Sequence, residues 1–142
     1  MATVRTASTN WEGDLAHGKG IVHFESSDLG DTDVSWAARS QEAGGKTSPE
    51  ELIAAAHSSC FSMALSGSLA KAGKPPQTLQ TRADVSFDPV AGSITGIHIT
   101  VRGTVPGLTS EEFTDAAEGA KANCPVSKAL TGTTITLDAA LA

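Results

Sequence analysis

The sequence predicts an α+β fold in which antiparallel sheets pack around one central, buried helix. Segments rich in β-branched residues, bounded by Gly and Asp, occur on both sides of the middle of the chain. Between them, the segment 52–70 holds no Asp, Glu, Lys or Arg. Helical segments do not alternate with single strands, which argues against the βαβ pattern of a parallel sheet. A chain of 142 residues is expected to form a single domain, 1–142.

The N-terminal part is expected to form a three-stranded meander, in which each strand pairs with the next one along the chain. Its β-branched residues lie between turn-forming Gly and Asp residues, as they do in half-buried strands. The three strands are predicted at Thr3–Trp11, Gly20–Ser26 and Val34–Arg39.

The central helix begins with signals that give two adjacent glutamates different roles. Ser48 is a good N-cap, and Pro49 suits the first helical position. Glu51 stands three residues after the cap, where a capping box places its carboxylate. Glu51 therefore has a structural role. Two interpretations of Glu50 stay open: an acid favoured in the first turn by the helix dipole, or an active-site carboxylate.

The first of the two cysteines, Cys60, lies within this helix. Residues around it are small or apolar on every side up to Lys71, so the helix is expected to be buried and to end at Gly73. Burial raises the pKa of a thiol and leaves it inert unless a cation compensates. The candidate cations are Arg5, Arg39, Arg82, Arg102 and a protonated His57.

The C-terminal half is expected to form a hairpin, a capped helix and a closing strand. Apolar positions alternate over Leu79–Phe87 and Ile94–Val105, which flank a turn. Thr109 and Glu112 have the spacing of a capping box that begins a helix, and Thr133–Leu141 alternates as the last strand.

The second cysteine, Cys124, stands directly before Pro125. This proline can open a new helical turn, which places the sulfur near a helix N-terminus that favours thiolate. A chain of this length needs no disulfide to fold, so redox or nucleophilic chemistry is the sharper interpretation of the two cysteines. Cys-x-x-Cys is absent and the four histidines are scattered, so no metal or other cofactor is expected.

Composition argues against several kinds of partner. A net charge of -6 without a basic stripe argues against nucleic acid. The first residues have no apolar signal-peptide core, and no uninterrupted apolar run approaches the roughly 18 residues of a membrane span. We therefore expect a cytoplasmic protein with no membrane partner, whose thiols stay reduced unless they perform redox chemistry.

Two motifs resemble the OsmC/Ohr family of thiol-dependent hydroperoxide reductases. They are Ser48–Leu65, with the sequence SPEELIAAAHSSCFSMAL, and Asn123–Leu130, with the sequence NCPVSKAL. Three shorter segments are similar to the OsmC branch: Trp11–Asp14, Gly18–Gly20 and Ile135–Asp138. Together these segments extend over nearly the whole chain, and the two long motifs stand in the order and at the separation typical of the family.

The resemblance implies an OsmC-like fold, an intertwined homodimer and a mechanism used in oxidative or osmotic stress defence. Cys60 would attack a hydroperoxide, organic in preference to hydrogen peroxide, and Cys124 would resolve the sulfenic acid as an intramolecular disulfide. An external thiol or lipoyl-type reductant would then reduce this disulfide. Glu50 matches the family's active-site carboxylate. Arg39 stands where the OsmC branch places the arginine that holds thiolate and carboxylate together.

Two other classes of function stay open. His57 lies three residues before Cys60 on the same helical face, which is compatible with a Cys/His acyl-transfer or hydrolytic enzyme that does not need Cys124. A non-catalytic stress protein would instead use its cysteines only as small buried side chains. If the protein binds an organic hydroperoxide, the apolar residues that suit its pocket are Phe61, Met63, Leu65 and Phe87.

Helix geometry constrains how one site can be built. Glu50 precedes Cys60 by ten residues, so in one straight helix their backbones would lie about 15 Å apart along the axis. Either the helix is broken near residues 54–57, or the Glu50 and Arg39 that serve one Cys60 come from another subunit.

Overall fold

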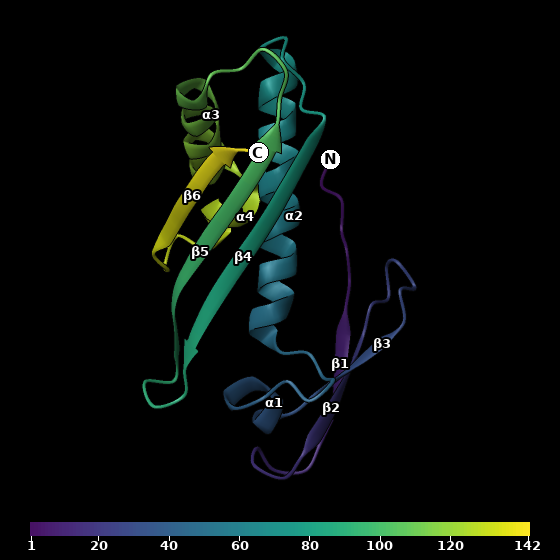
Figure 1. Cartoon of the computed structure of the whole chain (residues 1–142). Coiled ribbons are helices and arrows are strands. Elements are labelled where there is room, and N and C mark those ends of the chain that lie inside the picture. Colours follow the sequence, from purple (N-terminus) through teal and green to yellow (C-terminus); the bar gives the residue numbers. More distant parts are fainter. The chain divides into compact units, whose positions relative to one another are not determined.

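The computed structural model describes all 142 residues, Met1–Ala142, and has the α+β architecture that the sequence predicts (Figure 1). The chain forms two compact units, Met1–Leu52 and Ile53–Ala142, whose boundary falls inside the long central helix. The expectation of a single domain over 1–142 therefore stays a prediction.

The first unit contains a three-stranded antiparallel sheet. Its strands are β1 (Ser8–Glu12), β2 (Lys19–His23) and β3 (Asp31–Val34), and they pair in chain order. The predicted meander is confirmed, although each strand is shorter than expected. β1, for example, begins at Ser8 and not at Thr3.

A short helix, α1 (Trp36–Ser40), occupies most of the predicted third strand. The Ser35 side chain caps it by accepting a hydrogen bond from the backbone N–H of Ala38 at 3.1 Å. Two alanines follow Trp36, and alanine has the highest helix propensity of all residues. The prediction of a strand over Val34–Arg39 is wrong because this cap and these alanines favour a helical turn. Arg39 consequently lies in the last turn of a helix.

Helix α2 (Pro49–Lys71) is continuous over its 23 residues. The Ser48 hydroxyl accepts a hydrogen bond from the backbone N–H of Glu51 at 3.1 Å, which confirms the predicted N-cap. The Glu51 carboxylate accepts its bond from the Thr47 hydroxyl, so this competing donor replaces the second bond of a capping box. The structural role predicted for Glu51 is thus confirmed with a different partner.

The second unit is built on a three-stranded sheet with the order β4-β5-β6. β4 (Thr78–Asp88) and β5 (Ser93–Thr104) form the predicted antiparallel hairpin. Helices α3 (Ser110–Asn123) and α4 (Pro125–Ala129) follow, and β6 (Ile135–Leu141) then pairs with β5 in parallel. This parallel pair is the one difference from the expected antiparallel sheets. It is possible because the connection through α3 and α4 is long enough to return the chain to the starting end of the sheet.

One face of α2 is buried in the core of the second unit, and the opposite face is not. Phe61, Leu65 and Leu69 pack against side chains of β5 and α3, on the side of the sheet where both helices lie (Figure 1). The partners in this core are Ile97, Ile99, Val101, Val105, Phe113, Ala117 and Ala120. Met63 on the opposite face is 75% exposed. The helix predicted to be buried all round is therefore covered on one side only within this chain.

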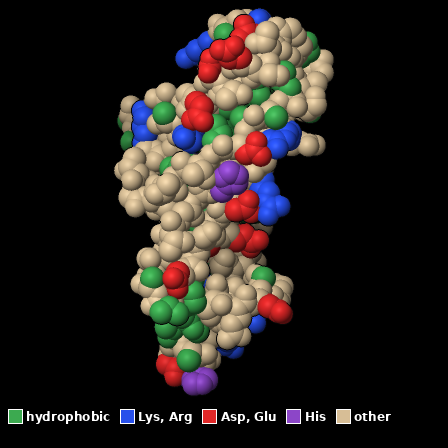
Figure 2. Space-filling view, turned by 60° about the vertical axis from the view of Figure 1, so that its left-hand side comes forward, with side chains coloured by type: hydrophobic (Ala, Val, Ile, Leu, Met, Phe, Trp, Pro, Cys, Tyr) green, Lys and Arg blue, Asp and Glu red, His purple; other side chains and the backbone are tan.

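By length and composition, α2 is the one helix of the chain that could cross a bilayer. No uninterrupted apolar run was expected to reach this length, and α2 meets the criterion by its mean hydropathy, because its scattered serines do not offset the alanines and larger apolar residues around them. Core helices of soluble proteins meet the same criterion, and α2 places three large apolar side chains in a protein core. The molecular face in Figure 2 carries interspersed acidic and basic side chains, without a basic stripe.

Candidate active site

The structure brings the two cysteines of the second unit together. Cys60 lies in the middle of α2, and Cys124 occupies the junction between α3 and α4. Both are free thiols, and their sulfur atoms are 3.0 Å apart although 64 positions separate the residues. Cys60 is partly exposed, whereas Cys124 is 0% exposed. A disulfide requires an S–S distance of about 2.05 Å, so a movement of about 1 Å would join them.

Cys124 lies at a helix N-terminus, as predicted. It is the N-cap of α4, and Pro125 takes the first helical position. Burial raises the pKa of the Cys124 thiol, but a hydrogen bond with Cys60 and interactions with the Ser127 and Val126 backbone N–H groups and the Ser127 hydroxyl oppose it. Their combined effect holds the pKa of Cys124 below its ordinary value.

The pKa of Cys60 changes in the opposite direction. Burial raises the pKa of this thiol, and the hydrogen bond with Cys124 raises it further, with partial opposition from the Val126 backbone N–H. The two pKa shifts favour loss of the proton from Cys124 before Cys60, and either sulfur can donate the hydrogen bond that joins them at 3.0 Å. This agrees with the expectation that Cys60 needs a cation before it becomes a nucleophile.

His57 does not form the Cys/His pair of the hydrolytic alternative. Its Nε2 lies 2.7 Å from the hydroxyl oxygen of Ser127, and its Nδ1 has no hydrogen-bond partner. The imidazole is 0% exposed, and burial lowers the pKa of His57, so the ring is neutral. The acyl-transfer interpretation has no support in this geometry. Sequence reasoning missed Ser127, whose only local signal is its position in the first turn of the helix that Cys124 caps.

Arg39 and Glu50 form an ion pair within the first unit. Arg39 Nε donates to the Glu50 carboxylate, at 2.7 Å to one oxygen and 3.3 Å to the other. Glu50 is only 7% exposed. A buried carboxylate without a partner is strongly unfavourable, and Arg39 supplies that partner. Glu50 is therefore the buried member of a partly buried ion pair and not a solvated acid of the first helical turn.

Of the other three candidate arginines, Arg5 donates to the backbone carbonyl of Val4 in the exposed N-terminal segment, and the remaining two form surface ion pairs. Arg82 forms a bidentate pair with Asp84, and Arg102 pairs with Asp138. Both pairs are substantially exposed, so they resemble ordinary surface ion pairs. Arg39 is the candidate cation whose carboxylate partner is buried.

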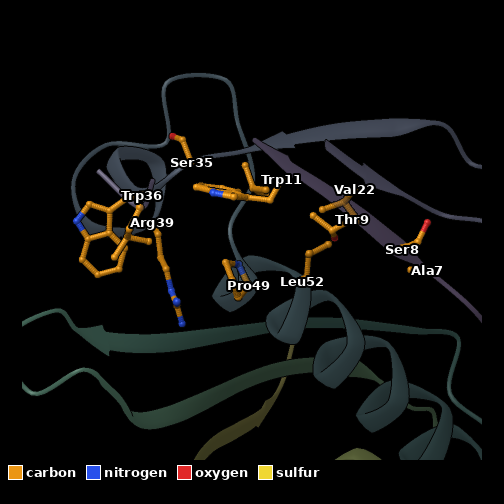
Figure 3. Close-up of a pocket in the computed structure, with 12 residues that line it drawn as sticks. Ala7, Ser8, Thr9, Trp11, Val22, Ser35, Trp36, Arg39, Pro49 and Leu52 are labelled. Carbon is orange, nitrogen blue, oxygen red and sulfur yellow. The ribbon is translucent and has the colours of Figure 1, made fainter. Parts of the chain in front are cut away.

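A pocket of about 450 Å³ lies beside Arg39 within the first unit. Arg39 and Trp36 reach it from α1, Pro49 and Leu52 from the start of α2, and Trp11 from β1 (Figure 3). Its lining is mostly apolar, with Leu15, Val22 and Val34 as further members. Such a lining, with one charged group, suits a small organic molecule.

The pocket residues suggested by the sequence are different and in part wrong. Phe61 and Leu65 are completely buried in the core of the second unit, so they line no pocket. They occupy the helix face that packs against the sheet, which composition alone could not distinguish from the exposed face.

Two free thiols within hydrogen-bond distance, one partly exposed and one at a helix N-terminus, are the arrangement that a thiol-dependent oxidoreductase uses. Residues 42–138 match the family model described as OsmC-like protein. The sequence is 44% identical over 140 residues to peroxiredoxin OsmC of Escherichia coli strain K12, covering 97% of this chain and 96% of that protein. Peroxiredoxin OsmC of Shigella flexneri matches equally well.

Solved structures share the fold. The organic hydroperoxide resistance protein OsmC of Legionella pneumophila superposes with a TM-score of 0.71 at 22% identity, covering 98% of this chain and 99% of that one. OhrB of Bacillus subtilis gives 0.69 at 23% identity, with coverages of 94% and 97%. The chain belongs to the OsmC family and is a cysteine-based peroxidase. The resemblance noted in the two cysteine motifs is thus confirmed.

Proposed function

We propose that the protein reduces organic hydroperoxides to alcohols, and hydrogen peroxide less well, with Cys60 as the attacking and Cys124 as the resolving cysteine. The observation that carries this proposal is the pair of free sulfurs 3.0 Å apart, of which only Cys60 is exposed to a substrate. The names of the relatives, a peroxiredoxin and organic hydroperoxide resistance proteins, support a hydroperoxide substrate. We extend this to a role in oxidative or osmotic stress defence.

The two cysteines and one peroxide molecule are sufficient for the oxidative part of the cycle. Cys60 thiolate attacks the peroxide oxygen, the O–O bond breaks, and Cys60 becomes a sulfenic acid while an alkoxide leaves. The alkoxide takes the proton that the two sulfurs shared, which gives the alcohol and leaves Cys124 as thiolate. Cys124 then attacks the Cys60 sulfur, the S–O bond breaks, and the departing hydroxide takes a proton from solvent. An external thiol or lipoyl-type dithiol reduces the resulting disulfide.

The attacking role falls to Cys60 although Cys124 has the lower pKa. Cys124 is completely buried, so a peroxide cannot reach its sulfur along a line of attack. Over the 3.0 Å between the sulfurs, the shared proton can move to Cys124 when a cation stabilises the thiolate at Cys60. The activation of Cys60 thus depends on a cation beside it.

We infer that Arg39, held by Glu50, is this cation and that a second copy of the chain supplies it. α2 is continuous from Pro49 to Lys71, so its geometry separates the backbones of Glu50 and Cys60 by about 15 Å along the axis. An unbroken helix supports the second option left by the sequence, a site shared between subunits. The apolar pocket beside Arg39 would hold the organic group of the peroxide.

The uncovered face of α2 supports a homodimer. Its exposed residues recur every three or four positions and carry no charge: Ala56, Ser59, Met63, Gly67 and Ala70. Cys60 lies at the edge of this stripe by its position on the helix. A second copy packed along the stripe would cover Met63 and bring its own residues next to Cys60. In this proposal the protein acts in the cytoplasm, with no cofactor, nucleic acid or membrane partner.

The function is tested by peroxide consumption with a dithiol reductant. The purified chain is mixed with cumene hydroperoxide, tert-butyl hydroperoxide or hydrogen peroxide, and with dihydrolipoamide or dithiothreitol as reductant. We expect catalytic turnover that requires the dithiol and is faster with the organic peroxides, because the pocket lining is apolar. Without reductant, consumption should stop at about one peroxide per chain. Absence of turnover with every peroxide, while both thiols stay reduced, would contradict the proposal.

Replacement of Arg39 is expected to make Cys60 less reactive. In Arg39→Ala, alkylation of Cys60 by iodoacetamide near neutral pH should slow about tenfold, because a nearby cation lowers a thiol pKa by one unit or more. Alkylation at each cysteine is followed by mass spectrometry. Arg82→Ala and Arg102→Ala, which remove arginines from exposed ion pairs, serve as controls and should leave the rate unchanged.

Because Arg39→Ala leaves Glu50 buried without a partner, a second variant is needed. Arg39→Gln/Glu50→Gln removes both charges together and should show the same slower alkylation. A larger effect from Arg82 or Arg102 would mean that Arg39 is not the activating cation.

A further inference from the structure

A buried polar chain leads away from Cys124 into the second unit. Ser127 lies in the first turn of α4, three residues after the helix cap that Cys124 provides. Its hydroxyl oxygen is 2.7 Å from His57 Nε2, although 70 positions separate the two residues. Ser127 is 3% exposed and His57 is 0% exposed, so water does not compete for this bond. The mechanism described so far uses neither side chain.

The tautomer of His57 determines the direction of the hydrogen bond between His57 and Ser127. The ring is neutral and Nδ1 has no partner in its buried site. A proton on Nδ1 would be a buried N–H without an acceptor, which proteins avoid more strongly than an unpaired acceptor. The proton therefore belongs on Nε2, which donates to the Ser127 oxygen. That bond leaves the Ser127 O–H as a donor, and the Ser127 hydroxyl interacts with Cys124, which caps the helix whose first turn holds Ser127.

We propose that His57 and Ser127 form a donor chain that holds Cys124 as a thiolate, ready to attack Cys60 once that residue is oxidised. The Ser127 hydroxyl lowers the pKa of Cys124, which agrees with donation to the sulfur. This proposal rests on the proposed function, since a resolving thiolate matters only if Cys60 becomes a sulfenic acid. His57 and Ser127 are positioning residues, because neither touches the peroxide or the reacting oxygen.

The donor chain of His57 and Ser127 acts on one step of the catalytic cycle, the attack of Cys124 on oxidised Cys60. Cys124 thiolate supplies the electron pair of the new S–S bond, Cys60 sulfur is the acceptor, and hydroxide leaves from the Cys60 sulfenic acid. His57 and Ser127 keep their protons throughout. Only the hydrogen bond from Ser127 to the Cys124 sulfur weakens, because the sulfur loses its negative charge as the disulfide forms. The exposed Cys60 is thereby resolved before a second peroxide can oxidise it to sulfinic acid.

The expected size of the effect follows from two opposing terms. Loss of one hydrogen bond to a charged group reduces the thiolate fraction about ten- to a hundredfold when the pKa lies above the working pH. A thiolate of higher pKa is also more nucleophilic, and on a logarithmic scale this offsets about half of the loss in reaction rate. Ser127→Ala should therefore slow formation of the disulfide about three- to tenfold.

The test separates oxidation from resolution. Each reduced protein is mixed with one equivalent of cumene hydroperoxide and quenched at intervals, and mass spectrometry quantifies the dimedone adduct of Cys60 and the Cys60–Cys124 disulfide. Ser127→Ala should accumulate more trappable sulfenic acid than the wild type and form the disulfide more slowly. Ser127→Thr keeps the hydroxyl and should restore the rate. Ser62→Ala, which removes another part-buried, hydrogen-bonded serine of this unit, should resolve at the wild-type rate.

His57 provides a second, independent measurement. His57→Gln can place an amide N–H near the position of Nε2 and should resolve faster than His57→Leu, which has no donor. Resolution in Ser127→Ala as fast as in the wild type, or equal rates for the Gln and Leu variants, would overturn the donor chain while leaving the peroxidase intact. A wild-type protein that forms no disulfide at all would instead refute the proposed function and this inference with it.

Discussion

Replacing Cys60 by serine is expected to reduce peroxide consumption to the background rate, whereas replacing Cys124 should still permit one oxidation per chain. The two residues are unequal because Cys60 is partly exposed, while Cys124 is completely buried beside it. In Cys124→Ser the sulfenic acid has no resolving partner and should persist long enough to be trapped by dimedone.

The structure also predicts the rate of that single oxidation. Cys124 raises the pKa of Cys60 through their hydrogen bond and through its negative charge. Removing the Cys124 sulfur removes both effects, so the pKa of Cys60 should fall toward its ordinary value. The first oxidation in Cys124→Ser should therefore be no slower than in the wild type, measured as dimedone adduct formed in the first turnover.

The double variant Cys60→Ser/Cys124→Ser is the control and should form no adduct. If Cys60→Ser and Cys124→Ser behaved alike, either both inactive or both trapped as sulfenic acids, the assignment of attacking and resolving roles would fail. A Cys60→Ser protein that still turned over peroxide would place the attacking sulfur at Cys124.

Local sequence signals predicted some elements well because their causes are local. The capping box of Thr109 and Glu112 forms as expected, with both reciprocal hydrogen bonds at the start of α3. The third strand was misassigned because the cap at Ser35 begins a helix at Trp36. The parallel pairing of β6 depends on where a long connection returns the chain, and no residue near Ile135 encodes that.

Some features of the candidate site could likewise be predicted from local sequence, and others could not. The different roles of Glu50 and Glu51 followed from the spacing of one helix start, and the structure agrees that only Glu50 pairs with Arg39. The donor chain from His57 to Ser127 joins residues 70 positions apart, so only the packed fold reveals it. Burial on one side of α2 was likewise invisible, since its two faces have similar small and apolar compositions.

The second large effect is expected from mixing an inactive variant with a weakly active one. Cys60→Ser lacks the attacking sulfur, and Arg39→Ala, or Arg39→Gln/Glu50→Gln if the single variant does not fold, lacks the activating cation. After dissociation and reassociation, a mixed dimer would contain one site that combines Cys60 of one chain with Arg39 of the other. We therefore expect purified mixed dimers to regain up to about half of the wild-type activity, since one of two symmetric sites is complete.

Two affinity tags, one on each variant, allow the mixed dimers to be isolated and their formation to be shown. Each variant reassociated with itself is the control: Cys60→Ser should stay inactive, and the Arg39 variant should keep about a tenth of the wild-type activity. Activity near half that of the wild type can arise only if a site draws Cys60 from one chain and Arg39 from the other. Mixed dimers that form but remain inactive would mean that each chain builds its own site. Arg39 would then have to activate Cys60 of its own chain, although α2 is continuous between Glu50 and Cys60.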